Sequence, residues 1–182
     1  VELHRGVLWD QPEHFASRKE LERLAGYAEH RETIAEVLSP IYETGADWQR
    51  LATLTELRLE TTDGQHERAA LWLRAARVRL ESLGDHEGGF QNLVSGLGEL
   101  PSHPEIREQL IEVGQRDERW SELVDCFAEA ATKADDLDRC VEDNLMVADW
   151  CCAYLDDRAR AIEHYRNALE VDPENSQALG AL

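Results

Sequence analysis

The sequence predicts an all-α protein built from a row of short helices, and three observations support this prediction. Apolar and small residues recur with the i, i+4, i+7 spacing of one helix face, as at Ala161, Tyr165 and Ala168. Gly and Pro stand at the breaks between such segments, and almost no segment alternates as a strand does. The chain also matches itself when shifted by about 72 residues, the separation of Ile34 and Ile106, which we call the repeat offset. Together these features predict helical hairpins that stack into a solenoid.

Residues 1–30 are predicted to form one helix or a pair of helices, which would be a partial repeat or a cap. A short helix is expected over Glu2–Trp9. A second helix is expected after Asp10, because Pro12 suits the first turn of a helix, and it should end before Gly26. The residues expected on its inward face are Phe15, Leu21, Leu24 and Ala25.

Residues 31–182 predict further helices joined by turns of a few residues. The first covers Arg31–Glu43, where Pro40 is expected to kink or divide the helix because proline lacks an N–H donor. A last helix is expected to start at Pro173 and is cut at Leu182. Since short connections force sequential helices to pack antiparallel, the natural unit is a hairpin. The helices between these two are expected over Trp48–Glu60, His66–Leu83, Gly88–Leu100, a segment opened by Ser102-His103-Pro104, a segment opened by Trp120, Leu137–Tyr154 and Asp157–Leu169.

The repeat offset aligns chemically distinctive residues as well as leucines. Chance explains isolated Leu pairs, but it does not readily explain two Trp, two turn Asp and two closing Pro in one register. Residues 31–182 are therefore predicted to form four hairpins of about 36 residues each, in two blocks that are each one repeat offset long. A helical bundle with accidental self-similarity is the alternative. The aligned pairs are Ile34 and Ile106, Leu38 and Leu110, Trp48 and Trp120, Leu51 and Leu123, Leu73 and Leu145, Leu83 and Leu155, Asp85 and Asp157, Leu97 and Leu169, and Pro101 and Pro173.

One hairpin carries the pattern of a known repeat family. Residues 142–175 place Ala161 where the two helices would cross and close with Asp172-Pro173. This segment resembles a tetratricopeptide repeat (TPR), and it has the usual length of such a repeat, about 34 residues. Residues 70–103 repeat its frame, with glycines at the two small positions, because long side chains would push closely approaching helices apart. The hairpins over residues 31–60 and 104–133 depart from the pattern, with Leu at the crossing position.

The resemblance implies a right-handed α-α superhelix of TPR-like hairpins. Its concave face, lined by the first helix of each hairpin, would hold an extended peptide or a partner helix. Trp150 and Met146 would then supply an apolar anchor while Arg74 holds a carboxylate. The alternatives are a core role for Trp150 and a solvated side chain for Arg74. By this correspondence the groove positions are Leu71, Arg74, Val78 and Glu81 in one repeat and Asp143, Met146, Trp150 and Ala153 in the next.

The charge of the chain restricts its partners. A formal net charge of −19 disfavours binding to nucleic acid or to an anionic membrane surface, and it favours a basic peptide or protein. A solvated acidic surface that serves solubility alone is the alternative. No apolar run approaches the roughly 18 residues that a membrane helix needs.

The sequence contains none of the common catalytic or metal-binding motifs that were sought. It has no GxSxG, no Gly-rich phosphate loop ending in Lys-Ser/Thr and no HExxH, so we expect neither catalysis nor a cofactor nor a metal site. The cluster Asp135, Asp136 and Asp138 is interpreted as a loop, with a cation site as the alternative. Four cysteines are predicted to be small buried residues of a helical core, which suits a reducing compartment and a cytoplasmic location. They are Cys126, Cys140, Cys151 and Cys152.

The function predicted from these features is a non-catalytic scaffold for protein-protein interaction. A structural spacer within a longer solenoid and a regulatory module of an enzyme whose catalytic domain lies elsewhere are the alternatives. The sequence begins without Met and without the features of a signal peptide, so we expect it to be a piece of a longer chain. Ala178, Leu179 and Leu182 would start a helix whose partner is absent, which predicts self-association through this end.

Overall fold

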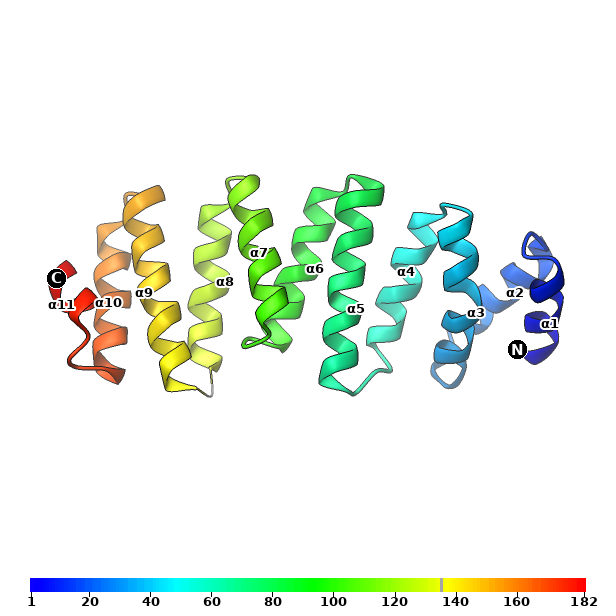
Figure 1. Cartoon of the computed structure of the whole chain (residues 1–182), viewed down its shortest axis with the longest axis horizontal. Coiled ribbons are helices and arrows are strands. Elements are labelled where there is room, and N and C mark those ends of the chain that lie inside the picture. The colour runs from blue at the N-terminus through cyan, green and yellow to red at the C-terminus, as the bar shows by residue number, and fades with distance from the viewer. Residues whose placement is uncertain (135) are drawn as a thin grey trace. The chain divides into compact units, whose positions relative to one another are not determined.

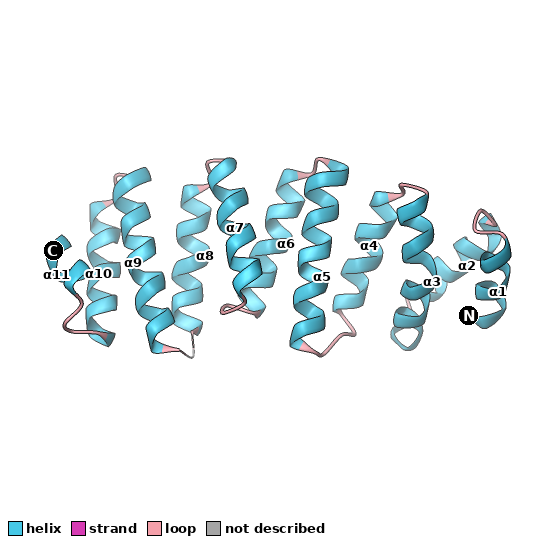
Figure 2. Ribbon diagram, in the orientation of Figure 1, coloured by secondary structure: helices cyan, strands magenta, loops and turns pink. Residues whose placement is uncertain are grey.

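The computed structural model describes residues 1–134 and 136–182, and every regular element in these two ranges is a helix (Figure 1; Figure 2). The chain forms two compact units, Val1–Asn92 and Leu93–Leu182. None of the described helices combines the length and the hydropathy that a bilayer span requires. The predicted all-α repeat fold is confirmed, and the handedness of the superhelix stays a prediction.

Each unit is a series of antiparallel helices joined by short turns. In the first unit α1 packs on α2, α2 on α3, α3 on α4 and α4 on α5. Its elements are α1 (Glu2–Asp10), α2 (Phe15–Leu24), the 3₁₀ turn η1 (Ala28–His30), α3 (Arg31–Thr44), α4 (Trp48–Leu59), α5 (Gln65–Arg77), the π-helical turn η2 (Val78–Leu83) and the first half of α6 (His86–Glu99).

The second unit begins within α6 and continues the same pattern. There α7 packs on α8, α8 on α9, α9 on α10 and α10 on α11. Its remaining elements are α7 (Pro104–Arg116), α8 (Trp120–Lys133), α9 (Leu137–Tyr154), α10 (Arg158–Val171) and α11 (Ser176–Ala181).

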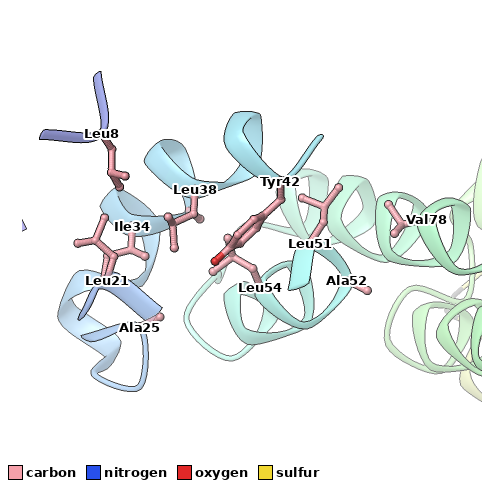
Figure 3. Close-up of a cluster of buried hydrophobic side chains, with 11 residues drawn as sticks. Leu8, Leu21, Ala25, Ile34, Leu38, Tyr42, Leu51, Ala52, Leu54 and Val78 are labelled. Atoms are coloured by element: carbon pink, nitrogen blue, oxygen red, sulfur yellow. The ribbon is translucent and has the colours of Figure 1, made fainter. Parts of the chain in front are cut away.

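The core of the first unit is built from the apolar stripes that the sequence spacing predicted. Leu21, Ile34 and Leu38 are completely buried, and Figure 3 shows Leu8 of α1 closing over Ile34 and Leu21. Tyr42 lies between Leu38 and the α4 leucines. Each helix thus contributes one face to an interior shared with its neighbours, because no single hairpin could bury its own stripe.

The repeat offset recurs in the helix boundaries. The first residues of α4 and α8 are separated by this offset, and so are those of α5 and α9, of α6 and α10, and of α7 and α11. The hydrogen bonds of the turns repeat as well. The Asp47 N–H donates to the Tyr42 carbonyl at 2.8 Å, and at the equivalent position of the next block the Arg119 N–H donates to the Gly114 carbonyl at 2.8 Å. The self-similarity of the sequence is therefore a similarity of backbone geometry.

The turn inside each of four successive hairpins contains one residue with a left-handed backbone. These residues are Ala46 (φ 53°), Gly84 (φ 65°), Glu118 (φ 56°) and Asp156 (φ 50°), and the repeat offset pairs Ala46 with Glu118 and Gly84 with Asp156. Such a residue ends a helix by turning the N–H groups that follow the helix back onto its free carbonyls, as in the bond from the Asp47 N–H to the Tyr42 carbonyl. Only one of the four is glycine, the residue that adopts this conformation without strain.

Small residues lie where helices approach closely, as the family pattern implied. A Cβ built on Gly89 would lie 2.4 Å from Leu80 Cγ and 3.3 Å from the Ala76 carbonyl, so α6 rests directly on the preceding helix. In the second unit a Cβ on Gly114 would lie 2.6 Å from Leu123 Cγ. The small residue that this hairpin needs is thus on its first helix, opposite the leucine that breaks the TPR pattern.

The start of α2 differs from the prediction. The helix begins at Phe15, because the His14 ring accepts a hydrogen bond from the Ser17 N–H at 3.2 Å and caps this end. Pro12 therefore lies in the turn before the helix. Phe15 was expected on the inward face and is 65% exposed, whereas Leu21 and Ala25 are buried as predicted.

Three other boundaries also differ. α3 is not divided at Pro40, whose exposed position makes the loss of one N–H donor tolerable, and a kink there stays a prediction. Residues 66–83 do not form a single α-helix, because the last turn widens into η2 and the Asp85 N–H donates to the Arg79 carbonyl at 2.9 Å. α11 begins at Ser176 rather than at Pro173, since the Asn175 side chain accepts the Ala178 N–H.

Replacing Ala46 by glycine should stabilise the first unit. The left-handed backbone at this position strains alanine but not glycine, so we expect Ala46→Gly to raise the free energy of unfolding by about 0.5–1 kcal/mol. Urea denaturation followed by circular dichroism measures this. The matched control is Ala70→Gly at an exposed site inside α5, which should lower stability by about 1 kcal/mol. Equal destabilisation at both sites would contradict the role assigned to Ala46.

Candidate functional site

An open cleft lies between α1 and α3, which are the first helices of two successive hairpins in the first unit. Its volume is about 620 Å³, which is within the usual range for ligand-binding pockets. One wall is α1 and the turn after it, and the other wall is α3. The lining residues are Arg5, Gly6, Leu8, Trp9, Pro12, Glu36, Val37, Pro40 and Ile41.

The cleft is an uncovered edge of the hydrophobic core. Leu8 belongs to the buried cluster, and Val37 and Ile41 are half-buried against it. Trp9 stands at the rim with 87% of its surface exposed, more than any other large apolar residue in the described chain. An exposed tryptophan beside an apolar cleft is a candidate for a binding surface, because Trp is enriched among the residues that dominate binding energy in protein interfaces.

The charged groups at the cleft are unequally compensated. The Arg5 guanidinium pairs with Glu2 at 2.9 Å within α1. The Glu36 carboxylate has no ion pair among the residues that the structure describes. The electrostatic potential at the cleft is therefore negative, because it is determined by the Glu36 carboxylate and by the acidic chain around it.

A second, smaller hollow of about 230 Å³ lies between α2 and α4, and a polar network of the protein itself forms part of its lining. The Tyr42 hydroxyl donates to Glu22 Oε1 at 2.7 Å, and Arg50 Nε lies 3.2 Å from the same oxygen. Burial and the Glu22 carboxylate both raise the pKa of Tyr42. This site is satisfied internally, so we assign it a structural role.

The groove residues predicted in residues 71–81 divide into buried and accessible ones. Leu71 and Val78 are buried packing residues and cannot contact a peptide from these positions. The side chain of Arg74 is partly exposed and forms an ion pair with Glu43 at 2.5 Å, which joins α5 to α3. Glu81 is exposed. For Arg74 and Glu81 the role in binding stays a prediction.

The groove residues predicted on α9 are divided in the same way. Asp143 is 1% exposed and Trp150 is 8% exposed, so both contribute to packing rather than to a peptide-binding surface. Met146 is half-buried and Ala153 is exposed. The helical spacing that suggested an apolar anchor at Trp150 is the spacing of the core face, in agreement with the alternative interpretation of this residue.

Asp143 and Trp150 belong to a network that crosses the second unit. Arg107 of α7 binds Asp143 with both terminal nitrogens, and the distance from Nη1 to Oδ2 is 3.1 Å. The guanidinium lies 4.8 Å from the ring centre of Phe127, which packs edge-on against Trp150 at 5.4 Å. Burial raises the pKa of the Asp143 carboxyl, and the ion pair with Arg107 opposes this rise.

The outer end of this network is a pair of stacked rings. Trp120 and Tyr154 lie parallel, with ring centres 3.5 Å apart and planes 4° apart, and Trp150 meets Trp120 edge-on at 6.1 Å. Together these rings attach the end of α9 to the start of α8.

The first unit has apolar residues where the second unit has this ion pair. The positions one repeat offset before Arg107 and Asp143 hold Ala35 and Leu71, both buried. The same backbone thus accommodates either an ionic or an apolar contact. An ion pair in this setting is weak evidence for stability, because desolvation of the two charges offsets most of their attraction.

The cysteines are only partly as predicted. Cys151 is buried, Cys126 and Cys140 are half-buried, and Cys152 is exposed. Burial raises the pKa of Cys126 to about 11 and also raises that of Cys151, which disfavours the reactive thiolate at both. No group of His, Cys, Asp and Glu suited to a metal ion occurs in the described ranges, and Asp135 of the acidic cluster lies outside them.

Sequence reasoning missed the cleft although signals for it were present. Gly6 interrupts a helical segment, Trp9 ends it, and Pro40 interrupts the facing helix. Trp9 was interpreted only as the end of an expected helix and Pro40 only as a kink or division, and Gly6 carried no prediction. The three residues border one cleft only in the folded chain, and Gly6 and Trp9 lie outside the part of the sequence that resembles a TPR.

Buried His164 adds a titratable group to the interior of the second unit. Asn144 donates its amide N–H to the Cys140 carbonyl at 2.9 Å, so its Oδ1 accepts from His164 Nδ1–H, also at 2.9 Å. Burial lowers the pKa of His164, the positive charge of Arg160 lowers it further, and Glu163 opposes both. The environment of His164 in the folded protein therefore favours the neutral imidazole.

The comparisons with known proteins find similarity to solved structures and give two negative results. Among solved structures the chain is similar to YrrB, described as a TPR protein with an unusual peptide-binding site, with 16% sequence identity and a TM-score of 0.40. The match covers 98% of this chain and 96% of that one. No protein-family model matches the chain, and no curated protein matches it. The fold assignment accordingly rests on the helices of this chain and their repeat.

A double-mutant cycle tests the ion pair of the second unit. Arg107→Ala or Asp143→Leu alone should lower the free energy of unfolding by about 3–5 kcal/mol, because each leaves a buried charge unpaired. The double variant has the residues of the first unit at these two positions. Its free energy of unfolding should be clearly higher than the value obtained by adding the two single-variant losses. Urea denaturation of the four proteins gives the coupling energy, and strict additivity would contradict an interaction between the two side chains.

The pH dependence of stability tests the assignment of His164. The pKa of this residue is lowered in the folded state. Its contribution to the free energy of unfolding is therefore fully present above the unfolded pKa of about 6.5 and is lost as the pH falls below that value. His164→Gln should reduce the slope of unfolding free energy against pH in this range by up to about 1.4 kcal/mol per pH unit. The difference between wild-type and variant unfolding free energies at pH 7, 6 and 5 measures the effect. His66→Gln at an exposed site of α5 is the control and should leave the slope unchanged.

Proposed function

We propose that this chain is a non-catalytic protein-interaction scaffold and that the cleft between α1 and α3 binds a segment of a partner protein. The observation that supports this most directly is Trp9, which is almost fully exposed at the rim of an apolar cleft. Leaving so large an apolar surface in water is unfavourable, and covering it would supply binding energy.

The construction of the site supports a role in binding rather than in catalysis. Its lining is mostly apolar, with one arginine and one glutamate, and the arginine is already paired with Glu2. A catalytic site would instead bring together titratable side chains with complementary roles. The cleft also lies between first helices of successive hairpins, which stacking holds in place at both walls.

Trp9→Ala should abolish binding of partner segments. We expect peptides selected from a random phage-displayed library on the immobilised full chain to lose affinity by about thirtyfold or more in this variant, because a buried Trp anchor typically dominates an interface. Fluorescence anisotropy with the selected peptides after synthesis measures this loss.

Phe15→Ala is the matched control. Phe15 is also an exposed aromatic residue of the N-terminal hairpin, but it does not line the cleft, so its removal should leave peptide affinity unchanged. Circular dichroism should show intact helices in both variants. If no selected peptide depends on Trp9, the cleft is not a binding site and the spacer interpretation of the chain is favoured.

A further inference from the structure

We propose that the segment bound in the α1–α3 cleft is basic and apolar: one of its apolar side chains lies directly on the backbone of α1 at Gly6, and a Lys or Arg donates to Glu36. This inference rests on the proposed function and specifies the partner's chemistry. Three features of the cleft support it, two of them in the backbone and one in the charges.

The first feature is Gly6 in the middle of α1. Glycine is less favourable than alanine inside a helix, so it needs a reason there. The folded chain supplies none, because a Cβ built on Gly6 would meet no atom within 4 Å. Gly6 is also one of the residues that line the cleft. The missing side chain leaves room for a ligand group to approach the helix backbone.

The second feature is Pro40 in the facing helix. Because proline has no N–H, the Glu36 carbonyl one turn earlier does not receive its usual helical hydrogen bond. Pro40 and Glu36 both line the cleft and both are exposed. Glu36 therefore brings a carboxylate acceptor to the cleft, and its backbone carbonyl lacks the usual helical donor.

The third feature is the sign of the charge. Arg5 is neutralised by Glu2, whereas Glu36 has no charged partner among the described residues, and the chain carries a net charge of −19. A Lys or Arg side chain is a donor that also compensates this charge. The same charge disfavours a second copy of this acidic chain as the occupant, because the two copies would repel each other.

The experiment selects peptides from the random phage-displayed library on the full chain and measures their affinities after synthesis. We expect the peptides that depend on Trp9 to share a Lys or Arg beside a large apolar residue. Replacing that basic residue by Gln, or making Glu36→Gln in the chain, should weaken binding roughly tenfold. Glu29→Gln, at an exposed site outside the cleft, is the control for the charge change.

Gly6→Ala tests whether a ligand side chain lies close to the backbone of α1, and it distinguishes this contact from a general loss of structure. This variant should raise the midpoint of thermal unfolding and yet weaken peptide binding roughly tenfold, because the added methyl group occupies the space of the ligand. Gly98→Ala is the matched control, since a Cβ there also meets nothing within 4 Å. It should not lower the thermal midpoint and should leave the peptide affinity unchanged.

The outcomes distinguish the two proposals. Peptides that depend on Trp9 but lack basic residues, or that tolerate Gly6→Ala, would overturn the partner chemistry and leave the cleft as a binding site. The absence of any peptide that depends on Trp9 would overturn both. Self-association that Trp9→Ala abolishes, seen by sedimentation of the full chain, would identify a second copy as the occupant and overturn the basic segment.

Discussion

The structure depends on reversing the chain inside each hairpin with a turn only a few residues long. Between α3 and α4 and between α7 and α8, the reversal is made by one residue in the left-handed region and by N–H groups that turn back onto the end of the helix. This geometry fixes where the second helix starts and therefore which of its faces meets the first. Once that register is set, the apolar stripes face a shared interior and the hairpins can stack. Ala46, Glu118 and Asp156 adopt this conformation although glycine would do so at less cost.

With the backbone fixed in this way, the interior can vary. The positions of Ala35 and Leu71 in the first unit are taken by the ion pair of Arg107 and Asp143 in the second. Phe127 then packs against the guanidinium. The ion pair adds little net stability over the apolar pair, because desolvation of the two charges offsets most of their attraction. The two units show that the repeat preserves helix register, while the chemistry between the helices differs.

Much of the fold follows from local sequence. Periodic apolar residues located α9 and α10 to within a residue or two, and the repeat offset holds at the level of individual hydrogen bonds. Predictions failed where a side chain competed with a general preference. The His14 ring moved the start of α2 past Pro12, and the Asn175 side chain moved the start of α11 past Pro173.

The candidate site was harder to predict than the helices. Helical spacing alone does not tell whether Trp150 faces a groove or a core, because that depends on Phe127 and Trp120, which are distant in sequence. At the cleft, three residues are unfavourable by local preference, and the fold of the chain supplies no reason for them. No neighbour within 4 Å requires a glycine at position 6, Pro40 removes a hydrogen bond from the opposite wall, and Trp9 exposes an apolar surface. Each of these is unfavourable for the chain in isolation, and all three border one cavity. In a folded sequence, local preferences normally agree with the overall fold. Several unfavourable residues around one cavity therefore indicate a requirement other than folding, and binding of a partner segment would supply one.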